Sequence, residues 1–142
     1  MPKALIIYDT FTGHTRTVAE KIKKHLEDLD FAVDLFRDKT FNGFETVQEY
    51  DVIALGSPAH GGVPALTLKR KLKSLFVMDL AGKKLITFSS SGGMQSAQWV
   101  VEKLEAFMAP TKITPLTSIV CQGKPPADFD RVLEMSIQEQ ML

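Results

Sequence analysis

The chain has 142 residues, 44% of them hydrophobic and 24% charged, and its 17 basic residues balance its 17 acidic ones. This length suits one domain with a substantial core, and the zero net charge gives no sign of a nucleic-acid partner. Cys121 is the single cysteine, which excludes an intramolecular disulfide and a cysteine-based metal cluster. We expect a single domain over residues 1–142, located in the reducing cytoplasm.

The amino-terminal segment gives no sign of a targeting signal. Its apolar run, Ala4–Tyr8, is too short for the core of a secretory signal peptide. No other segment approaches the roughly 20 apolar residues that a membrane span needs. We therefore expect a soluble protein without a membrane span.

Five apolar runs are predicted to form β-strands. They are Ala4–Tyr8, Phe31–Phe36, Val52–Gly56, Lys84–Ser89 and Leu116–Cys121. The first, third and fourth are nearly continuous in apolar residues, as in strands that are covered on both faces, whereas a charge interrupts the second and indicates an edge strand. Because amphipathic segments alternate with these strands, we predict an α/β fold of three layers with a doubly wound, five-stranded parallel sheet.

Helical periodicity fills most of the intervals between the strands. The first helix is predicted over Thr15–Leu29, the second begins near Pro64, the third follows Gly92-Gly93, and the last covers about Phe129–Met141. Their predicted packing residues are Val18, Ile22, Leu26 and Leu29, then Leu68, Leu72 and Leu75, then Ala97, Val100, Val101, Leu104 and Met108, then Val132, Leu133 and Ile137. The stretch Lys39–Tyr50 is predicted as a loop with a short helix.

The turn after the first strand combines three hydroxyl side chains with a glycine, directly before a helix. In a doubly wound sheet, ligands bind beyond the carboxyl ends of the strands, where the strand order reverses. A helix start favours an anion, threonine hydroxyls donate hydrogen bonds to it, and glycine lets the backbone approach. We predict a phosphate site formed by Thr10, Phe11, Thr12, Gly13, His14 and Thr15. The alternative is that Thr12 or Thr15 simply caps the helix.

Two loops rich in serine and glycine follow the third and fourth strands. Such loops let main-chain groups approach a flat heterocycle and bind the edge of its ring, although each loop alone could be an ordinary turn. Their candidate cofactor-binding residues are Ser57, Pro58, Ala59, His60, Gly61 and Gly62 in the second loop, and Ser89, Ser90, Ser91, Gly92, Gly93 and Met94 in the third.

The first turn resembles the hydroxyl-x-Thr-Gly-x-Thr phosphate loop of the flavodoxins, and Gly56-Ser57-Pro58-Ala59-His60-Gly61 resembles their second flavin loop. The order of elements is similar over nearly the whole chain. This resemblance implies a sheet order of 2-1-3-4-5, non-covalently bound FMN, and electron transfer with redox partner proteins. The fifth strand continues without a long insertion, which resembles the short-chain type.

The flavin loops lack the aromatic residues that flavodoxins usually place against the ring. His60 stands near the position of the usual Trp, and Met94 is the large apolar side chain of the third loop. We interpret His60-Gly61-Gly62 as the element that tunes the redox potential of the flavin. Because Ser57–Val63 and Ser89–Met94 contain no acidic residue, we expect reduced flavin to be less disfavoured than in many flavodoxins.

Three functions remain open. The main hypothesis is an FMN-binding electron carrier, more an electron carrier than a stand-alone enzyme, present as a monomer or weak homo-oligomer. The alternatives are a flavin-dependent reductase of quinones or similar small molecules, and a non-redox interaction module. We predict no metal site, because the three histidines lack metal-ligand spacing. Cys121 and Trp99 are expected to be packing residues.

Overall fold

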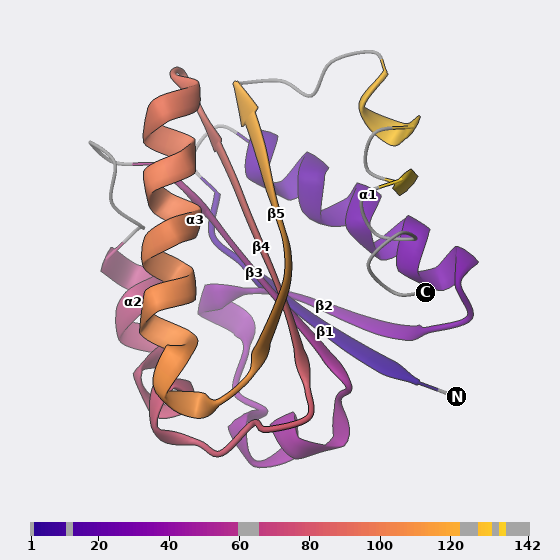
Figure 1. Cartoon of the computed structure of the whole chain (residues 1–142), viewed down its shortest axis with the longest axis vertical. Coiled ribbons are helices and arrows are strands. Elements are labelled where there is room, and N and C mark those ends of the chain that lie inside the picture. The colour runs from indigo at the N-terminus through magenta and orange to yellow at the C-terminus, as the bar shows by residue number, and fades with distance from the viewer. Residues whose placement is uncertain (1, 11–12, 60–65, 123–127, 132–133, 136–142) are drawn as a thin grey trace.

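A computed structural model of the chain describes residues 2–10, 13–59, 66–122, 128–131 and 134–135. The strands are β1 (Lys3–Tyr8), β2 (Ala32–Arg37), β3 (Val52–Pro58), β4 (Lys84–Ser91) and β5 (Thr114–Gln122). They form one parallel sheet in the order β2-β1-β3-β4-β5, which Figure 1 shows as a strongly twisted fan. The predicted α/β class and strand order are confirmed, and β2 lies at an edge as expected.

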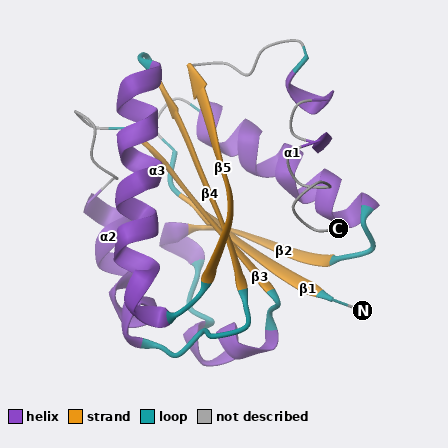
Figure 2. Cartoon of the chain, viewed as in Figure 1, coloured by secondary structure: helices purple, strands orange, loops and turns teal. Residues whose placement is uncertain are grey.

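Helices cover both faces of this sheet (Figure 2). One face packs against α1 (His14–Asp28), which buries Val18, Ile22 and Leu26 against β1, β3 and β4. The other face packs against α2 (Leu66–Lys71), the following 3-10 helix η3 (Leu72–Val77), and α3 (Met94–Met108). The alternating side chains of each strand divide the core into two layers, as a doubly wound sheet requires.

The predicted packing faces of the helices agree closely with the buried residues. All five apolar residues assigned to the inner face of α3 are buried. In the second helical segment the α-helix ends at Lys71 and continues as η3, yet all three predicted leucines are buried. Pro64 and the packing residues of the last predicted helix, Val132, Leu133 and Ile137, lie outside the described residues. The described part of that segment includes Phe129, which is buried against the α1 side of the sheet.

Several strand ends differ from the predicted ones. β3 and β4 each continue two residues further, so that Ser57 pairs with Ser89 and Pro58 pairs with Ser90. Serine and proline are common in turns, but Pro58 is the last residue of β3, where a missing N–H removes little of the hydrogen bonding between strands. At the other edge, β5 begins two residues earlier than predicted, and its register with β4 shifts between Leu85 and Ile86.

The segment before β3 contains two 3-10 helices, η1 (Asp38–Thr40) and η2 (Phe44–Glu49), where one short helix was predicted.

Cys121 is buried at 2% exposure, in agreement with the sequence, and burial raises the pKa of its thiol to about 11. Trp99 is 46% exposed, so its assignment as a packing residue was wrong. The inner face of α3 is set by Ala97, Val100 and Val101, which turns Trp99 outward. None of the helices described here has the length and apolar character needed to cross a membrane.

Candidate cofactor site at the carboxyl edge of the sheet

The sheet brings the ends of β1, β3 and β4 together at one edge. Tyr8 pairs with Gly56, and the ladder continues one bond further because the Asp9 N–H donates to the Gly56 carbonyl oxygen at 3.0 Å. On the other side of β3, Ser57 pairs with Ser89. The described parts of the three predicted loops are therefore neighbours in space, at the edge where ligands of doubly wound folds bind.

Gly13 forms the bend between β1 and α1. Its φ of +92° lies in the left-handed region, which glycine adopts without steric cost. Its N–H donates to the Thr10 hydroxyl oxygen at 3.0 Å, so the hydroxyl proton of Thr10 can be donated to a ligand. Gly13 is the N-cap of α1 and no side chain caps the helix, which removes Thr15 as the capping residue of the alternative interpretation.

Thr15 lies in the first turn of α1 and is only 2% exposed. None of the described residues forms a hydrogen bond with its hydroxyl group. The N–H groups of a first helical turn also lack acceptors within the helix, and the helix dipole adds positive potential there. Thr15 therefore supplies a hydrogen-bond donor beside the end of a helix that favours an anion. Phe11 and Thr12, which belong to the same predicted loop, lie outside the described residues.

The serine hydroxyls at the ends of β3 and β4 bond to the protein itself. Ser57 and Ser89 are both fully buried, and the Ser89 hydroxyl donates to the Ser57 carbonyl oxygen at 2.7 Å. The Ser57 hydroxyl donates in turn to the Pro58 carbonyl oxygen at 2.8 Å. These bonds fix the second and third loops relative to one another. Of the remaining second-loop residues, Ala59 is described, whereas His60, Gly61 and Gly62 lie outside the described residues.

The third loop exposes its main chain between two anchored points. A Cβ atom built on Gly92 or Gly93 would have no other atom within 4 Å, so the space beside this backbone is open. The Gly93 N–H donates to the Ser91 hydroxyl oxygen at 3.3 Å, and the Gln122 side-chain amide donates to the Gly92 carbonyl oxygen at 3.1 Å. A ligand can approach this backbone closely without displacing a side chain.

Sequence reasoning missed two charged residues at this edge. Asp9 is 8% exposed, and its Oδ1 accepts the Thr10 N–H at 2.9 Å. Arg37, the last residue of β2, donates from Nη2 to the Thr10 carbonyl oxygen at 3.2 Å and lies 3.8 Å from Asp9 Oδ1. No glycine-rich loop follows the edge strand β2, yet this strand ends beside β1, with Arg37 paired to Tyr8.

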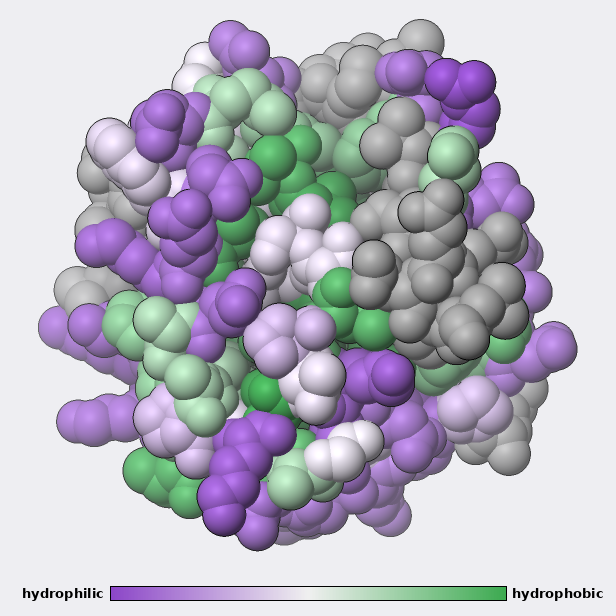
Figure 3. All heavy atoms as spheres, viewed as in Figure 1, coloured by the Kyte–Doolittle hydropathy of each residue, from purple (hydrophilic) through white to green (hydrophobic). Residues whose placement is uncertain are grey.

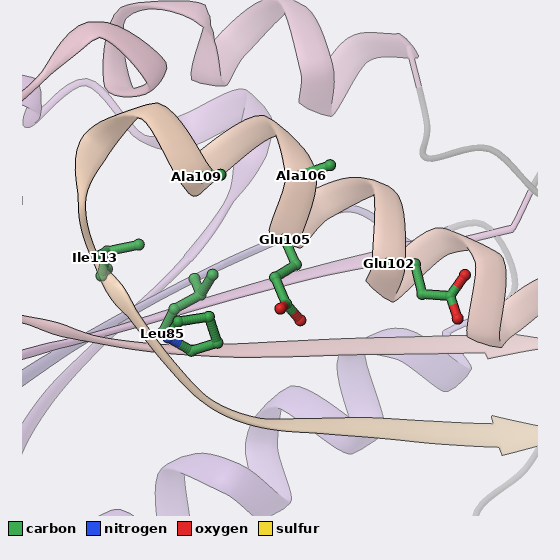
Figure 4. Close-up of a pocket in the computed structure, with 7 residues that line it drawn as sticks. Leu85, Glu102, Glu105, Ala106, Ala109 and Ile113 are labelled. Atoms are coloured by element: carbon green, nitrogen blue, oxygen red, sulfur yellow. The ribbon is translucent and has the colours of Figure 1, made fainter.

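The molecule also has a hollow away from this edge, with a volume of about 380 Å³. It lies beside the start of β4 and β5, and Glu102 and Glu105 point toward it from α3 (Figure 4). Its other lining residues are Leu85, Ala106, Ala109, Ile113 and Pro115. On the face viewed in Figure 3, hydrophobic residues are exposed in the upper middle, and hydrophilic residues predominate along the left and lower sides. The hollow contains no predicted cofactor-binding residue.

The described residues contain no group of three or more His, Cys, Asp or Glu side chains placed to hold a metal ion.

The fold and its edge site define a doubly wound α/β protein with a turn suited to a phosphate. Comparison with known proteins identifies the group to which it belongs. A family model for the flavodoxin domain matches residues 5–140, and the chain belongs to the flavodoxin family.

Two curated relatives have similar sequences. The chain is 26% identical over 131 residues to the flavodoxin-like domain-containing protein BilS of Clostridioides difficile, covering 86% of this chain and 66% of the relative. It is 32% identical over 96 residues to a flavodoxin of Aquifex aeolicus, covering 66% of this chain and 52% of the relative. The matched region therefore spans less than two thirds of the length of each.

Solved structures show the same fold at low sequence identity. A short-chain flavodoxin associated with a bacterial microcompartment superposes with a TM-score of 0.86 at 16% identity, covering 99% of this chain and 97% of the other. A Fusobacterium nucleatum flavodoxin variant bound to FMN gives a TM-score of 0.78 at 16% identity, covering 99% and 96%. The family inferred from the first turn is confirmed, and FMN is the cofactor of that family.

Proposed function

We propose that this chain is an electron-transfer protein that binds FMN at the carboxyl edge of β1, β3 and β4. The observation that carries the proposal is the turn between β1 and α1. There Gly13 adopts a left-handed conformation, and the hydroxyl of Thr15, a residue that is 2% exposed, forms no hydrogen bond with the described residues. A phosphate would satisfy this hydroxyl and the first N–H groups of α1 together. Family membership and the predicted loop pattern support the same ligand.

The first turn is proposed to hold the phosphate and the other two loops to hold the ring. Gly92 and Gly93 offer open main chain to the ring edge, and Met94, which is 45% exposed, offers an apolar contact. Ser57 and Ser89 keep the two loops in place through their buried hydroxyl bonds. The remaining proposed contacts are Thr10, Phe11, Thr12, His14, Pro58, Ala59, His60, Gly61, Gly62, Ser90 and Ser91.

Bound FMN supplies reversible one-electron and two-electron chemistry. The residues of this chain bind the phosphate, orient the ring and keep water from the buried side of the site. We also propose that residues 1–142 act as one flavodoxin-like domain, as a monomer or weak homo-oligomer, with a redox protein rather than a nucleic acid as partner. The buried, unpaired thiol of Cys121 supports a reducing, cytoplasmic setting.

Titration of the apoprotein with FMN and with riboflavin tests the proposed function. The change in flavin fluorescence reports binding, and Trp99, the single tryptophan, gives an independent signal from the helix that begins at the third loop. We expect saturable binding of FMN that is tighter than binding of riboflavin, because the phosphate turn adds contacts. Failure to bind FMN at high concentration would overturn the proposal and favour an interaction module.

A second measurement separates an electron carrier from a reductase of small molecules. The loaded protein is mixed with a nicotinamide dinucleotide and a quinone, and in a parallel reaction with a flavoprotein reductase and a haem protein as electron acceptor. A carrier passes electrons between the two proteins but does not turn over the quinone by itself. Rapid quinone turnover without the reductase would instead identify an enzyme.

A further inference from the structure

A buried carboxylate lies at the base of the turn that is suited to phosphate. Asp9 is 8% exposed, and its Oδ1 is fixed by the Thr10 N–H at 2.9 Å. Thr10 begins the phosphate turn, so Asp9 directly precedes in the chain the residues that are proposed to bind the anion. Like charges that lie close together repel strongly where protein excludes water. A phosphate therefore binds well here only if the charge of Asp9 is offset.

Arg37 provides that offset from the neighbouring strand. Its Nη2 lies 3.8 Å from Asp9 Oδ1 and donates to the Thr10 carbonyl oxygen at 3.2 Å, so one guanidinium contacts both residues that begin the turn. The backbone of Arg37 is held by the sheet, where it pairs with Tyr8. Its side chain is 42% exposed, which leaves part of the guanidinium accessible. A guanidinium stays protonated at any physiological pH.

The other described cations near the start of α1 have partners elsewhere. Arg16 forms an exposed ion pair with Glu20 at 2.8 Å, one turn along the helix. Lys21 bonds to Asp130 at 3.0 Å and lies further from the turn. Arg37 thus contributes its charge at the turn itself, whereas these two cations are engaged along the outer side of α1.

We propose that Arg37 determines the preference of this site for a phosphorylated flavin, by neutralising Asp9 and fixing the Thr10 carbonyl. This inference rests on the proposed function, because it concerns the same cofactor site. Arg37 acts on the phosphate through Asp9 and Thr10, and is a positioning residue. Its charge matters to FMN, which carries a phosphate, and not to riboflavin, which has the same ring without one.

The test compares the dissociation constants of FMN and riboflavin in a set of variants. Arg37→Gln removes the charge, and Arg37→Lys keeps it. Lys84→Gln is a matched control, because it removes one exposed cation at the first residue of β4, at the amino-terminal end of the strands. We expect Arg37→Gln to weaken FMN about tenfold and to leave riboflavin unchanged, which corresponds to one partly screened charge interaction. Arg37→Lys should retain most of the preference, and Lys84→Gln should retain all of it.

Removal of Asp9's charge provides a second arm. Asp9→Asn keeps an oxygen that can accept the Thr10 N–H, and it should restore FMN binding in the Arg37→Gln background. An equal loss of FMN and riboflavin in Arg37→Gln would overturn the inference, since it would mark a general structural role. Unchanged FMN binding would also overturn it. Both results differ from failure of the proposed function, in which the unmodified protein binds no FMN.

Discussion

Gly56 and Phe88 lie opposite one another on β3 and β4, so closely that a Cβ on Gly56 would stand 2.0 Å from Cε2 of the Phe88 ring. We expect Gly56→Ala to lower the free energy of unfolding by about 1–3 kcal/mol, because the fully buried ring must move within a packed core. The shift is measured by urea denaturation. In a Phe88→Leu background the added methyl group should cost less, and an equal cost in both backgrounds would contradict the assigned contact.

Thr15→Val tests the hydroxyl that forms no hydrogen bond with the described residues. The two side chains have nearly the same shape, so the variant should fold normally and bind riboflavin as before. FMN should bind roughly 10- to 150-fold more weakly, because a hydrogen bond to a charged group contributes about 1.5–3 kcal/mol. Thr15→Ser keeps the hydroxyl and should retain most of the affinity. If Thr15→Val bound FMN normally, the phosphate would have to lie elsewhere.

Tyr50 donates a hydrogen bond of 2.6 Å to Asp34 Oδ2, which joins the start of β3 to β2. Burial, the hydrogen bond and the charge of Asp34 all raise the pKa of Tyr50 well above its usual range. The folded state therefore holds the phenol proton more tightly than the unfolded chain does. This contribution is fully present below about pH 10, the ordinary pKa of tyrosine, and is lost as the pH rises further.

Two measurements follow for this hydrogen bond. Tyr50→Phe should lower the free energy of unfolding by about 1 kcal/mol at neutral pH, since one hydrogen bond is lost and the ring stays. The unmodified protein should lose stability more steeply above pH 10 than the Phe variant does. Parallel slopes for the two proteins would show that the pH effect arises at other residues.

Cys121 should resist alkylation in the folded protein. Burial raises its pKa from 9.0 to about 11, so the thiolate population at pH 8 falls about a hundredfold, and the residue is also only 2% exposed. Labelling with iodoacetamide should therefore be slow in buffer and fast in concentrated urea. A rate in buffer that matched the rate in urea would mean that the end of β5 opens readily. Because the pKa of this thiol is higher in the folded state than in the unfolded chain, its protonation favours the folded state. This contribution is fully present below pH 9.0, the ordinary pKa of the thiol, and is lost as the pH rises further.

Periodicity and strand composition predicted most of the fold because they report burial directly. The continuous apolar runs correspond to β1, β3 and β4, and the leucine and valine spacings identified the inner faces of α1 and α3. Strand ends were less accurate, because Ser57 and Ser89 pair in the ladder although serine is a common turn residue. Trp99 shows that one apolar residue near a helical stripe need not belong to it.

The pair formed by Asp9 and Arg37 could not be found from local sequence. The two residues come from different strands and meet only because β2 pairs with β1 in a register that sets Arg37 beside Tyr8. The same holds for the Ser89 hydroxyl bond to the Ser57 carbonyl. The residue types of the first turn indicate a phosphate site. The ion pair and the hydrogen bonds around that site depend on the pairing of strands that are distant in the sequence.

The order β2-β1-β3-β4-β5 also bears on how the site comes into being during synthesis. β1 leaves the ribosome first, yet it lies inside the sheet and its carboxyl end meets partners that are made much later. Such pairing between distant segments closes large loops and is intrinsically slow. A ribosome-bound fragment that ends before β4 therefore has the phosphate turn but lacks the third loop. If FMN binds both loops, as proposed, it stabilises the finished sheet more than it stabilises such a fragment.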